Sequence, residues 1–145
     1  WNFWRKFVSA TSVQFEGFPG NPENIGLTER VFLGGMHDLR GFRYRSIGPE
    51  FEGDDSISRG GSAKAVIRQE VRFPIYKKLR GHVFCDTGTI ADESFSFGSP
   101  RATAGVGLSL ELVESLVLGV DIGHAVLKEA GDETNALMIK MGYSF

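Results

Sequence analysis

The chain has 145 residues, the length of one ordinary domain, with 16 basic and 18 acidic residues. The net charge of −2 excludes nucleic-acid binding through bulk electrostatics, and the scattered charges leave no apolar stretch long enough for a membrane-spanning helix. A single cysteine, Cys85, excludes an internal disulfide. The three histidines (His37, His82 and His124) are too scattered to indicate a metal site. We expect neither a metal nor a cofactor.

The start of the chain indicates a fragment. It begins at Trp1 in a strand-like segment, without an initiator methionine or a targeting pattern. We therefore expect residues 1–145 to be the C-terminal part of a longer protein, with N-terminal strands and any soluble domains outside this sequence.

Alternation of apolar and polar residues predicts about six strands, each of roughly ten residues. A weakly alternating strand over residues 3–15 is followed by a long loop, about residues 18–61, rich in glycine and charge. The later strands cover residues 63–73, 80–88, 101–113, 116–123 and about 135–145. The alternation is clearest in residues 101–113, where one face carries Ala102, Ala104, Val106, Leu108, Leu110 and Leu112.

Strand length and loop lengths favour an all-β, antiparallel transmembrane barrel. Short turns such as residues 113–115 alternate with long connections, and the alternating strands lack proline. The aromatic residues Tyr143 and Phe145 at the chain end agree with a membrane strand. A soluble β-sandwich with a binding role remains an alternative, because period-two alternation alone does not separate the two folds.

Several ordered motifs resemble the BamA-type outer-membrane barrel-assembly superfamily, also described as the bacterial surface antigen domain. The most specific is a double glycine, Gly34-Gly35, before Leu39-Arg40-Gly41-Phe42. The other matching pieces follow in order along nearly the whole chain: Ser46-Ile47-Gly48-Pro49, Glu52-Gly53-Asp54, Gly60-Gly61, Glu70-Val71-Arg72-Phe73-Pro74 and Phe84-Cys85-Asp86-Thr87-Gly88. The continuation after Phe42 is most similar to the central barrel subunit of the mitochondrial sorting and assembly machinery.

The resemblance implies the C-terminal portion of a 16-stranded barrel, about six strands, with a long loop inserted into the lumen. It implies that Arg40, in the loop motif Leu39, Arg40, Gly41 and Phe42, pairs with Glu70 and Asp86 on the inner wall. The alternation agrees independently, because both carboxylates lie on the polar faces of their strands. Gly41 fits a loop tip that approaches the wall closely, and Gly105 and Gly107 would leave room at that wall.

The implied function is an outer-membrane insertase that folds and inserts β-barrel precursors through a lateral gate. The terminal strand would form one side of this gate, with Ile139, Met141, Gly142, Tyr143 and Phe145 as its residues. The implied partners are membrane lipid, β-barrel precursors and accessory subunits of an assembly complex. The resemblance favours the mitochondrial over the bacterial outer membrane, although Tyr143 and a final Phe145 are closer to bacterial endings.

The same residues suggest two other functions. A polypeptide translocation or secretion pore of the same superfamily would carry the same loop motif. Glu70 and Asp86 could in principle act as general acid and base, but no substrate motif or third group accompanies them. We therefore expect no enzymatic activity and no catalytic residues.

Overall fold

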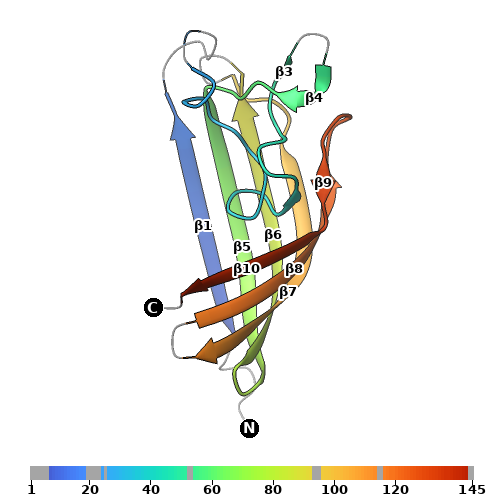
Figure 1. Cartoon of the computed structure of the whole chain (residues 1–145). Coiled ribbons are helices and arrows are strands. Elements are labelled where there is room, and N and C mark those ends of the chain that lie inside the picture. Colours follow the sequence, from blue (N-terminus) through green and yellow to red (C-terminus); the bar gives the residue numbers. More distant parts are fainter. Residues whose placement is uncertain are drawn as a thin grey trace.

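A computed structural model describes residues 7–18, 24, 26–51, 54–92, 96–113 and 116–143. Six strands form one antiparallel sheet in the order β1-β5-β6-β7-β8-β10 (Figure 1). Their bounds are β1 Val8–Gly17, β5 Ala63–Tyr76, β6 Leu79–Ala91, β7 Arg101–Val113, β8 Leu116–Leu127 and β10 Leu137–Tyr143. Among the described residues, none belongs to a helix long and apolar enough to cross a membrane.

The sheet follows the alternation of the sequence and confirms the predicted antiparallel all-β fold. On β7, Val106 and Leu108 are exposed on the outer face, whereas Arg101 and Thr103 are buried on the inner face. The sheet curls strongly from β1 to β10, and the inner polar face lies on its concave side (Figure 1). The six long strands form one curved sheet with β1 and β10 at its edges, not the two packed sheets of a sandwich.

The connection from β1 to β5 folds back over the concave face of the sheet. This connection, residues 18–62 as far as they are described, is called the inner loop below (Figure 1). It contains β2 (Gly41–Phe42) and the small hairpin of β3 (Glu50–Phe51) and β4 (Asp54–Ser58). A hydrophobic cluster joins the loop to the sheet and consists of Leu33, Leu39, Phe42, Ile47, Val66 and Ile90.

Several strands extend beyond their predicted bounds: β5 to Tyr76, β6 to Ala91 and β8 to Leu127. Pro74 lies inside β5, which continues to Tyr76, so the connection to β6 is only Lys77 and Lys78. The strand tolerates this proline because the β5–β6 register shifts between Pro74 and Tyr76, near the strand end. Residues 3–6 of the first predicted strand, residues 3–15, lie outside the described residues.

The predicted terminal strand, residues 135–145, is divided into two pieces. β9 (Thr134–Asn135) pairs with β2 of the inner loop, and only β10 pairs with β8. The division falls at Ala136, whose carbonyl accepts a hydrogen bond from the Gly123 amide of β8. Gly41 of the loop packs against Gly123 at the same level, with the ideal Cβ position of Gly123 only 3.3 Å from Gly41 Cα. Gly41 therefore lies over the inner face of β8, and residues 134 and 135 pair with β2 of the loop instead of continuing along β8.

Candidate functional site: the arginine of the inner loop and its carboxylates

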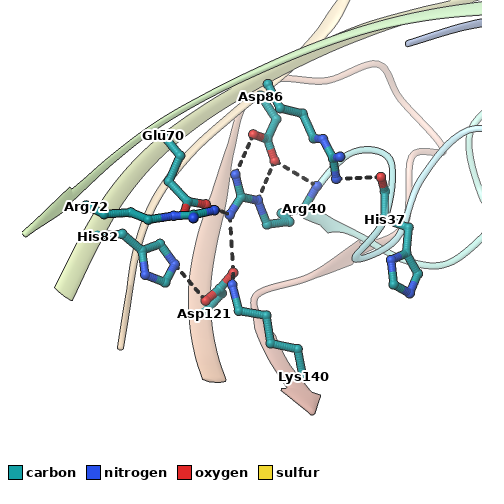
Figure 2. Close-up of polar contacts among 9 residues, drawn as sticks. His37, Arg40, Glu70, Arg72, His82, Asp86, Asp121 and Lys140 are labelled. Carbon is teal, nitrogen blue, oxygen red and sulfur yellow. Dashed lines mark hydrogen bonds and ion pairs between the residues drawn. The ribbon is translucent and has the colours of Figure 1, made fainter. Parts of the chain in front are cut away.

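Arg40 is the central residue of the contact between the inner loop and the sheet. Its Nε and Nη2 donate to Asp86 Oδ2 at 2.7 Å and Oδ1 at 2.8 Å, a bidentate pair. Its Nη1 donates to Glu70 Oε2 at 2.7 Å and to Asp121 Oδ2 at 3.3 Å (Figure 2). The structure therefore brings Arg40, Glu70 and Asp86 together from the loop, β5 and β6.

The side chains of this charge cluster are shielded from solvent. Asp86 is completely buried, Asp121 is 1% exposed and Arg40 is 5% exposed. Burial by itself lowers the pKa of Arg40, but its hydrogen bonds and charge interactions with Asp86 and Glu70 outweigh that effect and raise the pKa above its ordinary value. The guanidinium is therefore a permanent cation that fixes the loop against the wall.

The wall beneath Arg40 is shaped by one aromatic ring and two glycines. The guanidinium carbon of Arg40 lies 3.7 Å from the centre of the Phe84 ring on β6. A Cβ on Gly105 would lie 2.3 Å from Phe84 Cζ, and a Cβ on Gly107 would lie 2.3 Å from His82 Nε2. Gly105 and Gly107 therefore leave room for side chains of β6 that line the site.

The loop motif approaches the wall closely on both sides of Arg40. Gly41 has a φ of +88°, and a Cβ there would lie 2.6 Å from Thr103 Cγ2 on β7. Both the backbone conformation and the contact therefore require glycine. Leu39 and Phe42 are buried in the cluster that joins the loop to the sheet. The motif thus places one charged side chain between two apolar anchors.

Asp121 is a member of the site that the sequence analysis did not select. It lies on β8, on the same inner face as Glu70 and Asp86, and contacts two groups besides Arg40. Its Oδ1 lies 2.9 Å from His82 Nε2, and its Oδ2 accepts a hydrogen bond of 2.9 Å from Lys140 Nζ. Its position on the polar face of an alternating strand was the available signal, as it was for the other two carboxylates.

A second group of polar contacts holds the loop to β5. Lys64 Nζ donates to Asp38 Oδ2 at 2.9 Å and also lies 3.1 Å from Glu16 Oε2 of β1. Arg68 Nη1 donates to the carbonyl of His37 at 2.6 Å. The sequence analysis predicts no role for Lys64 or Arg68. Their partners lie in the loop, and strand alternation does not predict where loop residues lie.

The residues proposed for the terminal strand lie apart from the charge cluster. Ile139 and Met141 are 65% and 73% exposed on the outer face of β10, and Gly142 is also exposed. Tyr143 is the end of β10, where its backbone pairs with Leu116. Phe145 lies outside the described residues. β10 is an edge of the described sheet, so one side of its backbone has no neighbouring strand there.

The chemistry of the cluster is that of charge pairing. An open hollow of about 270 Å³ lies beside it, bounded in part by Arg40, Glu70, Asp121 and Lys140. Each of the three carboxylates accepts a hydrogen bond from at least one cation; for Glu70 a second one comes from Arg72, at 2.6 Å. With all three held in this way, the geometry favours positioning of the loop over proton transfer.

The comparisons with known proteins agree with this geometry. The chain is 30% identical over 101 residues to the outer membrane protein assembly factor BamA of Neisseria meningitidis serogroup B. This match covers 64% of the chain and 13% of that protein. The crystal structure of BamA from Haemophilus ducreyi lacking POTRA domains 1–3 superposes with a TM-score of 0.78 and 23% identity. That match covers 97% of this chain and 32% of the other.

The chain therefore spans only a small part of both relatives. Both are bacterial, so the preference for a mitochondrial member is not supported by them. The family model described as the Omp85 superfamily domain matches residues 1–145, the whole sequence. With the ordered motifs, the curved antiparallel sheet and the loop arginine in its carboxylate cluster, this match shows that the chain belongs to the Omp85 superfamily.

Proposed function

We propose that this chain is the C-terminal barrel portion of an outer-membrane insertase, which folds and inserts β-barrel precursor proteins. One observation carries the proposal: the inner loop is fixed on the polar face of the sheet by Arg40, while the opposite face is apolar and exposed. A sheet with an apolar outer face and a polar, loop-filled inner face suits a barrel wall in a lipid bilayer. The superfamily match and the bacterial relatives support the same proposal.

The proposed mechanism needs no covalent catalysis. Unpaired backbone amides and carbonyls cost several kcal/mol each in lipid, so a nascent membrane strand needs a partner edge. β10 is an edge of the described sheet, and it would form one side of a lateral gate to which a precursor strand pairs. Arg40 would keep the inner loop braced against the wall behind this gate.

The partners follow from the mechanism. Lipid would cover the outer face, which carries Val106, Leu108 and Ile122 at 55%, 50% and 56% exposure. β-barrel precursors would be the substrates, and accessory subunits would assist in an assembly complex. The protein would lie in an outer membrane, as the name of the Neisseria relative states for that protein.

The test uses the full-length parent in its native membrane and follows the insertion of a labelled β-barrel precursor. Arg40→Ala leaves Asp86 buried without its main cation, a change that costs about 3–5 kcal/mol in comparable buried pairs. We expect unassembled precursor to accumulate although the variant barrel itself is present in the membrane. Arg45→Ala is the matched control, because Arg45 is an exposed arginine of the same loop whose guanidinium lies over the Phe32 ring, within the loop itself.

The alternative within the superfamily is a translocation pore, and the same assay separates it. If precursors assemble normally in the Arg40→Ala variant while a secreted or imported polypeptide stalls, the proposed insertase function is wrong. The protein is then a translocation pore.

A further inference from the structure

The inner loop contacts the segment that leads into β10, in addition to the wall formed by β5 and β6. β2 and β9 form an antiparallel pair in which Gly41 lies opposite Asn135 and Phe42 opposite Thr134. The pairing continues to Arg43, whose amide donates to the Glu133 carbonyl at 2.9 Å and whose guanidinium lies 2.6 Å from the Glu133 carboxylate. Residues 133–135 are therefore paired with the loop and not with β8.

A second link between the loop and β10 runs through Asp121. One oxygen, Oδ2, accepts hydrogen bonds from Arg40 Nη1 of the loop at 3.3 Å and from Lys140 Nζ of β10 at 2.9 Å. Figure 2 shows Arg40 and Lys140 reaching this carboxylate from different sides. Because Asp121 is buried, its carboxylate needs partners, and these two cations and His82 provide them.

The two links lie on either side of the point where the C-terminal segment changes its partner. Before Ala136 the segment follows β2 of the loop, and after Ala136 it follows β8. The Lys140 link lies within β10, where Lys140 is opposite Gly119. β10 is therefore linked to the loop through the segment just before its start and through Lys140 near its middle.

We propose that the inner loop positions β10, with Asp121 as the positioning residue that joins Arg40 to Lys140. Docking of the loop tip, residues 39–43, and pairing of β10 with β8 then stabilise each other. Such coupling is reciprocal, so a change that fixes the loop tip must also reduce the opening of β10. This inference goes beyond the proposed function, because it concerns an equilibrium that exists without any precursor.

The experiment fixes the loop tip covalently and measures the opening of β10. Arg43→Cys and Glu133→Cys are introduced together into the full-length protein with Cys85→Ala, so that only the new pair can form a disulfide within this chain. Residues directly opposite each other on two antiparallel strands lie at a Cα separation that suits a disulfide. Amide hydrogen exchange of residues 137–143 is then measured in lipid nanodiscs for the oxidised and reduced forms of the same protein.

We expect oxidation to slow exchange in residues 137–143 by about threefold or more, and reduction to restore it. Unchanged exchange on oxidation would mean that the loop tip and β10 move independently, and the proposal would be wrong. Failure of the disulfide to form would also contradict it, because the loop tip would then not lie beside Glu133.

Lys140→Met tests the second link without the engineered cysteines. The variant removes the contact from β10 and leaves Asp121 with Arg40 and His82. We expect exchange in residues 137–143 to accelerate by about threefold, the size expected for an ion pair whose lysine is partly exposed. Exchange in residues 39–43 should accelerate as well, since the coupling is reciprocal.

Arg80→Met is the matched control for this test. It removes an ion pair between β6 and β7, in which Arg80 Nη2 lies 3.5 Å from Glu111 Oε2, and this pair involves no residue of the inner loop or of β10. We expect it to leave exchange of residues 137–143 unchanged. Equal acceleration by Arg80→Met and Lys140→Met would indicate general loosening and would overturn the proposal. Because exchange is measured without a precursor, the result does not depend on the insertion assay.

Discussion

At the scale of single residues, Arg40 makes a set of contacts that no other side chain could reproduce. Three of its nitrogens donate to three carboxylates, and its planar face lies on the Phe84 ring. A lysine has one ammonium group and could not pair with Asp86 in bidentate fashion while it also contacts Glu70. Exchanging Arg40 and Asp86 would not restore the site either, because an aspartate at position 40 would face both Glu70 and Asp121.

The glycines of the wall give a prediction at this scale. Gly105→Ala would place a Cβ 2.3 Å from the Ile122 carbonyl oxygen and 2.3 Å from Phe84 Cζ, so β7 or the ring must move. We expect a loss of barrel stability of about 1–3 kcal/mol, the usual cost of overpacking. It can be measured as a lower temperature for the transition from the folded to the unfolded form on semi-native gels.

The matched control for that measurement is Gly98→Ala. The nearest atom to a Cβ on Gly98 is the Ile90 carbonyl oxygen at 3.5 Å, an ordinary contact. We expect its transition temperature to equal that of the unchanged protein. Equal transition temperatures for the Gly105→Ala and unchanged proteins would show that Gly105 does not shape the seat of Phe84.

At the scale of strands, alternation predicts faces but not partners. It assigned Glu70 and Asp86 to the inner face because each lies among polar residues of its own strand. Asp121 lies on the inner face by the same rule, yet its contact with Arg40 depends on the path of the inner loop. That path is set by a buried cluster of residues far apart in the sequence, which strand periodicity does not describe.

The division of the terminal strand was unpredictable for a related reason. Residues 135–145 are predicted as one strand, but the backbone of Thr134 and Asn135 pairs with β2 of the loop, and only residues 137–143 pair with β8. Either partner offers the backbone equivalent hydrogen bonds, so the choice depends on the position of the inner loop and not on the local sequence.

The register of β10 gives a prediction for the proposed gate. The Gly123 amide donates to the Ala136 carbonyl, and Ile139 lies opposite Val120. Because hydrogen-bonded and non-bonded pairs alternate in an antiparallel ladder, the Ile139 amide points away from β8 toward the free edge. Ile139→Pro therefore removes a donor from that edge but spares the ladder with β8. We expect a folded barrel with little insertion of labelled precursor.

Ile139→Ala is the control, because it shortens the same side chain and keeps the amide. It should insert precursor nearly as well as the unchanged protein. Full insertion activity of a folded Ile139→Pro barrel would exclude this donor from the gate.

At the scale of the whole molecule, the two faces of the sheet have opposite chemistry. The inner face holds the charge cluster and the loop, and a water-exposed outer face would leave many large apolar side chains in solvent. Scattered exposed apolar residues are ordinary, but here they occupy alternate positions on neighbouring strands such as β7 and β8. The proposed lipid contact explains this pattern through the same alternation that places Arg40's partners inside.

Lipid contact makes the cost of a charge depend on depth, which gives a final prediction. Leu108 lies near the middle of β7, whereas Val126 lies near the end of β8, and they are similarly exposed at 50% and 59%. In a bilayer, arginine at the midplane costs about 2–4 kcal/mol and near the interface about 0–1 kcal/mol. In water, both surface changes would cost less than about 0.5 kcal/mol. Denaturant unfolding of the full-length protein in lipid vesicles should therefore show Leu108→Arg strongly destabilised and Val126→Arg nearly unchanged. Small and equal losses in the two variants would contradict the proposed membrane face.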